Sequence, residues 1–150
     1  MKNGKNSTNG KGNKVAYIDG VAHQIKPEHT SVLKFVREYV GEKKIPSLCD
    51  DPNLAPYGAC RVCSVDMALK KDGPTKTVAS CHTPVTDGSY IITNNEDLEN
   101  LRKNIVELVL TDHPMTCSTC EVNNNCELQT VANDLGINEH RYNKPKQNKG

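Results

Sequence analysis

The positions of cysteine and histidine constrain this 150-residue chain more than any other feature of its sequence. All seven cysteines and one of the five histidines fall into two groups of four, namely Cys49, Cys60, Cys63 and Cys81, then His113, Cys117, Cys120 and Cys126. Each group contains a C-x2-C pair, which can bind adjacent positions of one metal centre. Two groups of four ligands, with no cysteine left over, predict two metal sites.

Two kinds of metal site fit this spacing. Iron-sulfur clusters are held by four thiolates, or by thiolates together with histidine. Zinc takes four thiolates, or three thiolates and one imidazole, and its ligands often come as two close pairs. The first group has one close pair, Cys60 and Cys63, and its other ligands lie far away in sequence. The spacing favours clusters, and a zinc-stabilised structural adaptor that docks other subunits is the alternative.

Disulfides are a third use of cysteine, and the sequence disfavours them. Seven is an odd number, and residues 1–14 are basic and polar without the apolar run of an export signal. No stretch approaches the roughly 18 consecutive apolar residues of a membrane span. We therefore expect a cytoplasmic protein without a membrane span, in a compartment that keeps thiols reduced.

Composition predicts one modest domain with a smaller appendage. The chain has a single Phe, no Trp and 35% hydrophobic residues, so metal binding is expected to supply part of the folding free energy. Lysine and arginine are concentrated at the two ends, and we expect disordered basic tails at residues 1–13 and 138–150. The part between them is acidic and poor in aromatic residues, which argues against nucleic-acid binding.

The first half of the chain predicts a hairpin followed by a helix. Residues 14–19 and 21–25 are short extended runs that meet at the tight-turn pair Asp19-Gly20. A helix is expected from Thr30, as its N-cap, to Gly41. Two strands followed by a helix that can cross the sheet are the opening of a β-grasp unit.

A long irregular loop is expected after Ile45, and it contains two of the cysteines. Gly58 and Ala59 immediately precede Cys60, so backbone N–H groups could approach the sulfur atoms closely. Further strands are predicted within residues 61–69, 76–81 and 89–93. Cys81 then lies at the end of a strand, where a fixed scaffold can hold it against the loop.

The second half predicts two helices around the second group of ligands. The first begins after Asn94 or Asn95 and ends near Asp112, with Pro114 disfavouring helix at His113. Its apolar residues with helical period are Leu98, Leu101, Ile105, Leu108 and Val109. A second, short helix is expected from Cys126 to Gly136, with an apolar stripe that faces the core, consisting of Leu128, Val131, Ala132 and Leu135.

One histidine is expected to complete the second group. His113 lies at a helix end before three closely spaced cysteines, and His82, next to Cys81, is its competitor. The remaining histidines, His23, His29 and His140, are expected in ordinary surface positions.

Three segments resemble a known family, and together they carry all eight ligands. They are IPSLCDDPNLAPYGACRVCSVDM, ASCHTPVTDGSYIIT and LRKNIVELVLTDHPMTCSTCEVNNNCELQTVANDLGI. They resemble the amino-terminal iron-sulfur module of the large iron-sulfur subunit of complex I, which is the G subunit of NADH dehydrogenase. The same module occurs in iron-only and NAD-reducing hydrogenases, NAD-dependent formate dehydrogenases and electron-bifurcating complexes. The resemblance covers residues 14–137.

This resemblance implies an α+β fold with two cluster-binding units. A β-grasp, ferredoxin-like domain at 14–94 would hold a [2Fe-2S] cluster through Cys49, Cys60, Cys63 and Cys81. A small helical domain at 95–137 would hold a [4Fe-4S] cluster through His113, Cys117, Cys120 and Cys126. Larger members of the family continue into further cluster-binding and catalytic domains, so no substrate site is expected in this chain.

The resemblance also implies a role and partners. The chain would be an electron-transfer subunit of an NAD(P)H-linked oxidoreductase, relaying single electrons between a flavoprotein and further redox subunits, with ferredoxin among the expected partners. No dinucleotide-binding or phosphate-binding glycine motif is present in the sequence. Nicotinamide and flavin are therefore expected on a partner that resembles the NADH-oxidising FMN subunit of complex I.

Overall fold

A five-stranded mixed sheet forms the first half of the molecule. The computed structural model describes residues 13–139, 141 and 142. The strands are β1 (Val15–Ile18), β2 (Val21–Gln24), β3 (Ser64–Ala68), β4 (Lys76–Ala79) and β5 (Tyr90–Ile92), in the spatial order β2-β1-β5-β3-β4. β1 and β5 run parallel, and the other neighbours are antiparallel. This mixed sheet, with the helices described below, confirms the predicted α+β class.

The opening hairpin follows from its turn residues. Asp19 and Gly20 both have positive φ, at 47° and 89°, as a two-residue turn between twisted strands requires. The Asp19 carboxylate also accepts hydrogen bonds from the backbone N–H and hydroxyl of Thr93, at 2.8 and 2.6 Å. The turn is thereby joined to the end of β5, which places the first and last strands of the sheet side by side.

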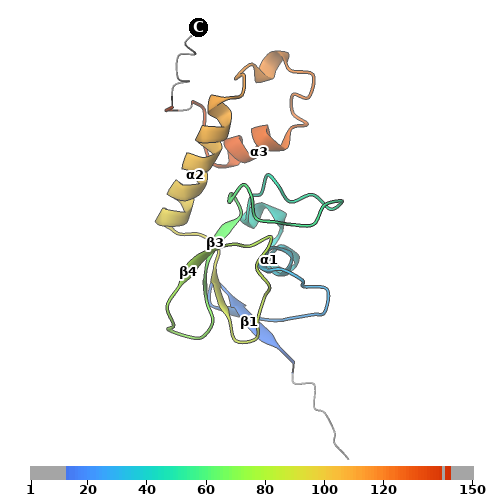
Figure 1. The fold of residues 1–150 in the computed structure, drawn as a ribbon, viewed down its shortest axis with the longest axis vertical. Helices are drawn as coiled ribbons and strands as arrows, with labels where there is room; N and C mark the ends of the chain where they lie inside the picture. The colour runs from blue at the N-terminus through green and yellow to red at the C-terminus, as the bar shows by residue number, and fades with distance from the viewer. Residues whose placement is uncertain (1–12, 140, 143–150) are drawn as a thin grey trace, which may run out of the picture.

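Helix α1 (Val32–Val40) covers one face of this sheet (Figure 1). Its N-cap is Ser31, one residue later than predicted, because the Ser31 hydroxyl accepts a hydrogen bond from the backbone N–H of Lys34. It ends at Gly41, where φ is 99°, as expected, and a short 3-10 turn, η1 (Glu42–Lys44), follows. The buried side chains Val32, Leu33, Phe35 and Val36 join the strands in the main apolar core.

Two further helices carry the second half of the molecule. α2 spans Glu96–Thr111 with Asn95 as its N-cap, and α3 spans Glu127–Asp134 with Cys126 as its N-cap. Between them lies the 3-10 turn η2 (Cys117–Thr119). Figure 1 shows α2 and α3 together at one end of the molecule, and the loop after η1 lies between α1 and α3.

A second apolar core joins these helices to the loop that precedes β3. It contains Val106 and Leu110 from α2 and Val131 and Ala132 from α3, and Val62 is buried among them. Six more members come from the loop, from the two helices and from the residues just after α3: Leu48, Cys60, Ile105, Leu128, Leu135 and Ile137. The predicted stripe on α3 is therefore confirmed as core, and a segment containing first-group ligands is packed into the same core.

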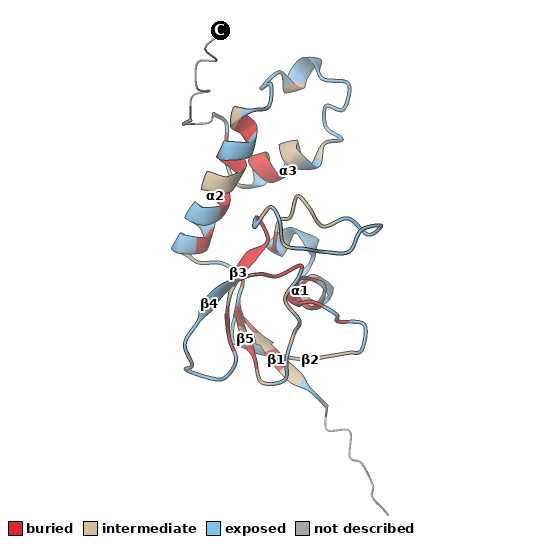
Figure 2. Cartoon of the chain, in the orientation of Figure 1, coloured by how far each residue is buried: buried red, intermediate tan, exposed pale blue. Residues whose placement is uncertain are grey.

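The predicted apolar face of α2 was largely wrong. Leu98 is buried and Ile105 packs in the second core, but Leu101, Leu108 and Val109 are exposed. The buried face is instead formed by the residues Leu98, Arg102, Val106, Glu107 and Leu110. Figure 2 shows this division, with buried residues along one side of α2 and exposed residues along the other. The side of α2 that contains Arg102 is buried because it packs against the sheet, the loop before β3 and α3.

The expected surface positions of the histidines also need correction. His29 is buried, and its Nδ1 atom accepts a hydrogen bond from the backbone N–H of Lys26 at 3.0 Å. Its Nε2 atom bonds to the carboxylate of Glu38, which explains how a polar ring is accommodated there. His23 is half-buried and its ring packs on Tyr39. His140 lies outside the described residues.

The structure describes the two predicted tails only in part. Residues 1–12 and 143–150 lie outside the described residues, so their expected disorder stays a prediction. Arg141, in the predicted C-terminal tail, contacts α2, where its guanidinium pairs with Glu107 at 2.8 Å and also bonds to Asn104. Each helix in the described part of the chain is too short or insufficiently apolar to cross a lipid bilayer.

Candidate metal centres

The first group of cysteines gathers at one end of the sheet. Cys49 and Cys60 come from the loop after η1, Cys63 immediately precedes β3, and Cys81 follows β4. Cys63 and Cys81 are fully buried, and Cys49 and Cys60 are half-buried. The backbone N–H of Cys60 approaches the Cys49 sulfur at 3.5 Å, and burial together with the thiols of Cys63 and Cys49 raises the pKa of Cys81. The fold thus brings all four residues to one region.

Burial strongly affects the thiol of Cys81. Burial, followed by the neighbouring Cys63 and Cys49 thiols, raises the pKa of Cys81 to about 12. A hydrogen bond from the backbone of Gly58 acts in the opposite direction. Without a metal, the Cys81 side chain is therefore a neutral thiol at pH 7. Metal ligands are thiolates, so binding at this site would release a proton.

Gly58 is required by the shape of the loop around these sulfur atoms. Its φ is +71°, and a Cβ atom at this position would lie 3.2 Å from the Cβ of Ala79 and 3.6 Å from that of His82. The Gly58 backbone opposes the rise that burial causes in the pKa of Cys81, as expected for an N–H group near the sulfur atom. Hydrogen bonds of this kind are found around iron-sulfur clusters, where they influence the reduction potential. Four clustered cysteines with such a loop fit a cluster.

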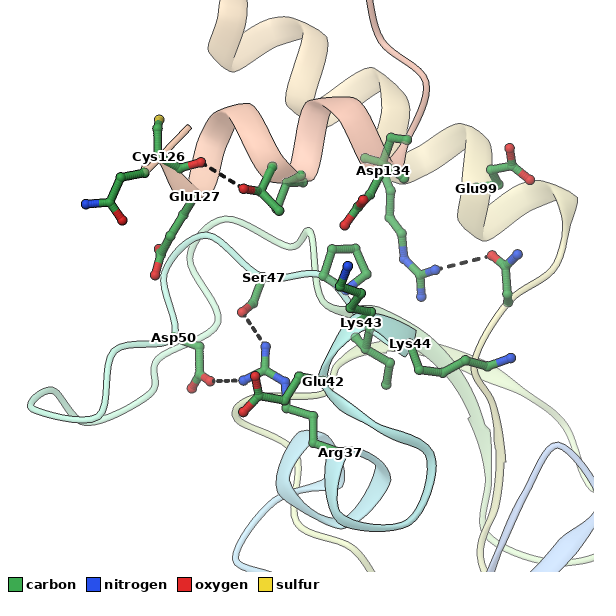
Figure 3. A pocket seen from close by; sticks show the side chains of 18 of the residues that line it. Arg37, Glu42, Lys43, Lys44, Ser47, Asp50, Glu99, Cys126, Glu127 and Asp134 are labelled. Atoms are coloured by element: carbon green, nitrogen blue, oxygen red, sulfur yellow. Dashed lines mark hydrogen bonds and ion pairs between the residues drawn. The ribbon is translucent and has the colours of Figure 1, made fainter. Parts of the chain in front are cut away.

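Arg37, on α1, holds the segment that carries Cys49. Its guanidinium donates to the Ser47 hydroxyl at 2.7 Å and to the Asp50 carboxylate at 2.8 Å (Figure 3). These two acceptors flank Cys49 in sequence, so the rigid helix fixes the loop on both sides of the ligand. No local sequence pattern predicts this contact, because Ser47 and Asp50 lie 10 and 13 residues from Arg37 along the chain.

A mixed-charge cleft of about 730 Å³ lies beside this segment. Figure 3 shows it between the loop that carries Ser47 and Asp50 and the helix that carries Glu127 and Asp134. Side chains of both signs line it, among them Lys43 and Glu42. Cys126, from the second group, also lines the cleft, whereas none of the first-group cysteines does.

The second group lies around the ends of α2 and α3. His113 follows the end of α2, where its backbone N–H donates to the carbonyl of Leu110 at 3.1 Å. Cys117 begins η2, Cys120 follows it, and Cys126 is the N-cap of α3. A cavity of about 160 Å³ is lined by His113, Cys117 and Cys126 together with apolar residues of both helices. Cys120 is exposed and does not line it.

The competing histidine lies with the other group. His82 is exposed, and its Nδ1 atom lies 3.1 Å from the carbonyl oxygen of Pro56, in the loop that contains Cys60. Of the two candidates, only His113 shares a cavity with second-group cysteines. Within residues 13–139, 141 and 142, no three side chains of the ligand types converge as a ready-made site for a single metal ion. The ligand sets are therefore inferred from neighbourhood and spacing.

The chain matches two family models, which meet at α2. Residues 16–96 match the 2Fe-2S iron-sulfur cluster binding domain. Residues 102–141 match the NADH-ubiquinone oxidoreductase-G iron-sulfur binding region. The first match contains all four first-group cysteines, and the second contains His113 and the three cysteines that follow it.

Relatives and a solved structure agree with these matches. The G subunit of the NADH-quinone oxidoreductase of Buchnera aphidicola subsp. Schizaphis graminum is 42% identical over 131 residues, which are 85% of this chain and 14% of the relative. The NADPH-Fe(3+) oxidoreductase subunit alpha of Geobacter sulfurreducens is 38% identical over 98 residues, 65% of this chain and 11% of the relative. The NAD+-reducing [NiFe]-hydrogenase, in its H2-reduced crystal structure, shares the fold with a TM-score of 0.70. That match has 24% identity and covers 87% of this chain and 52% of the hydrogenase chain.

The curated relatives are much longer proteins, of which the chain spans only 11–14%. The matched segments nevertheless include all of the sheet except its first residue, Val15, and both ligand groups. The domains of these models bind a 2Fe-2S and a 4Fe-4S cluster. The chain therefore belongs to the iron-sulfur family defined by the 2Fe-2S cluster binding domain, which is followed here by the iron-sulfur binding region of the NADH-ubiquinone oxidoreductase-G proteins.

Proposed function

We propose that this chain is an electron-transfer module that relays single electrons between two iron-sulfur clusters within a larger NAD(P)H-linked oxidoreductase. The observation that carries the proposal is the placement of Cys49, Cys60, Cys63 and Cys81 at one end of the sheet, where the loop that contains Cys60 packs against the helices of the second group. When bound, the clusters would supply one-electron redox chemistry. The chain's own residues would set the distance between the clusters and their electrostatic surroundings.

Each group has a distinct proposed role. Cys49, Cys60, Cys63 and Cys81 would hold the [2Fe-2S] cluster, with the N–H groups of Gly58 and Cys60 directed at sulfur atoms. His113, Cys117, Cys120 and Cys126 would hold the [4Fe-4S] cluster. Three of these four line one cavity, and Cys120 would turn inward from its exposed position when the cluster binds.

The second apolar core supports electron transfer between the two groups. Cys60 packs in this core with Leu110 of α2, and Leu110 also lines the second-group cavity. The two sites are therefore separated by packed side chains rather than by open solvent. Such packing holds the distance between them constant and limits rearrangement of polar groups when charge moves.

The partners are proposed from the family. A flavoprotein resembling the NADH-oxidising FMN subunit of complex I would supply electrons, and further redox subunits, with ferredoxin among them, would accept them. A flavin on that partner would divide a two-electron hydride equivalent into single electrons. Because the chain spans a small part of its relatives, the substrate chemistry would take place elsewhere in the complex.

Metal analysis of protein purified without oxygen tests the proposal. The expected result is about six irons per chain, acid-labile sulfide and two reducible paramagnetic signals. A colourless protein with two zinc ions and no labile sulfide would refute it and would support the zinc-stabilised adaptor instead.

A histidine pair tests the ligand sets. His113→Ala should damage the [4Fe-4S] signal and leave the [2Fe-2S] spectrum intact, because His113 lies at the second-group cavity. His82→Ala is the matched control, since His82 is exposed and adjoins Cys81. Loss of the [2Fe-2S] spectrum in His113→Ala, or loss of the [4Fe-4S] signal in His82→Ala, would mean that the sites are misassigned.

A further inference from the structure

Arg102 is a buried cation beside the first group of cysteines. It lies on α2 and only 3% of its surface is exposed, which is rare for a charged residue. Its Nη2 atom donates to the backbone carbonyls of Ser64, at 2.6 Å, and Thr93, at 2.7 Å. Its Nη1 atom donates to the Asn94 side-chain oxygen at 3.2 Å. Ser64 directly follows Cys63, so the guanidinium adjoins a proposed cluster ligand.

The positive charge of Arg102 has no paired carboxylate among the described residues. All its hydrogen-bond acceptors there are neutral oxygens, and its Nε atom has no hydrogen-bond partner. Asp66 instead bonds to Thr77 and Asn95, and Glu99 pairs with Lys103. A buried charge without a counter-charge is strongly unfavourable, so its presence at this position indicates an anion nearby.

Cysteine sulfur can supply that anion. Burial lowers the pKa of Arg102, and among the groups that raise it the largest contribution comes from Cys63, ahead of Asp66 and Glu99. Because Arg102 donates to the carbonyl of Ser64, the residue after Cys63, the guanidinium lies beside the segment that carries the Cys63 thiol. Four thiolates around iron and sulfide make an anionic assembly, which becomes more negative by one unit when one electron is added.

We infer that Arg102 tunes the first site, where its buried positive charge stabilises the reduced form of a [2Fe-2S] cluster held by Cys49, Cys60, Cys63 and Cys81. This inference rests on the proposed function. In the one-electron step the cluster gains an electron from an external reductant, no bond is made or broken in the protein, and Arg102 keeps its proton. The guanidinium attracts the added charge, and the low polarity around it limits screening by salt.

The test is an EPR-monitored redox titration of the anaerobically purified full chain, with dithionite as reductant. In Arg102→Gln, the ratio of reduced to oxidised [2Fe-2S] at a fixed potential should fall at least about tenfold, which is a midpoint about 59 mV lower. Arg102→Lys keeps the charge and should remain within about twofold of the wild type. Lys103→Gln removes a partly exposed charge from the same helix and should leave the potential unchanged, because water screens that charge.

The outcomes separate this inference from the proposed function. Wild-type protein without iron and sulfide would refute the proposed function and the inference with it. Wild-type protein with the cluster, and an Arg102→Gln variant with normal iron content and an unchanged midpoint, would overturn the inference alone. An Arg102→Lys midpoint as low as that of Arg102→Gln would also overturn it, because geometry rather than charge would then be responsible.

A second variant keeps the inference testable if Arg102→Gln does not retain its cluster. Asn94→Asp would place a carboxylate against the guanidinium while Arg102 and its bonds to Ser64 and Thr93 stay in place. Its midpoint should fall below that of Asn100→Asp, which adds the same charge to an exposed position on α2. Equal midpoints in these two variants would overturn the inference.

Discussion

Replacing Gly58 by alanine should weaken the fold and the first cluster together. At φ +71° an alanine is in the left-handed region, which costs about 1–2 kcal/mol for a residue with a Cβ. The new Cβ would also lie 3.2 Å from the Cβ of Ala79. Such overpacking typically adds about 1–3 kcal/mol. The total is about 2–5 kcal/mol, and the displaced loop should move the Gly58 backbone away from the Cys81 sulfur.

Gly88→Ala is the matched control for this prediction. Gly88 has φ +76° and nothing within 4 Å of an added Cβ, so only the backbone term of about 1–2 kcal/mol applies. Denaturant unfolding under anaerobic conditions gives the free energies, and the loss of visible absorbance in the presence of a chelator gives cluster lability. Equal values for Gly58→Ala and Gly88→Ala in both assays would refute the reasoning.

Two further substitutions test the packing of α2 and the start of α1. Leu110→Ala should destabilise the protein by about 2–5 kcal/mol, because Leu110 is buried in the second core. Leu108→Ala, at an exposed position on the same helix, should change the stability by no more than about 0.5 kcal/mol. Similar losses of unfolding free energy in urea for the two variants would contradict the burial of the Leu110 side of α2. Ser31→Ala should lower the free energy of unfolding by about 1 kcal/mol, because the helix loses its N-cap hydrogen bond. If thermal unfolding shows a larger loss for Thr30→Ala, the N-cap is Thr30 instead.

Local patterns were sufficient for most elements of the fold. Asp19 and Gly20 require positive φ, and this located the first hairpin in the sequence. Asn95 caps α2, and Gly41 ends α1, as residues of these types commonly do. The two ligand groups could be separated because each combines a close pair with a distinct surrounding pattern. These turns, caps and ligand spacings depend only on residues close together in the chain, so the sequence alone predicts them.

The errors arose where distant parts of the chain decide the outcome. α2 has apolar residues on more than one side, so periodicity alone could not show that the Leu110 side is buried and the Leu108 side exposed. Arg102 can be buried because the backbone carbonyls of Ser64 and Thr93 accept hydrogen bonds from it. Neither residue lies on α2, so the sequence of the helix does not show this contact. His29 is buried for a similar reason, since Glu38 from α1 bonds to its ring.

The packing of Cys60 and Val62 with α2 and α3 has a consequence for biogenesis. The loop that would close around the first cluster also packs against α2 and α3. If this loop is not ordered in the chain without clusters, α2 and α3 would lack part of the surface that they pack against. We therefore expect the clusters to be inserted in sequence. Insertion of the first cluster beside the sheet would order the loop, and the ordered loop would then position α2 and α3 to bind the second cluster.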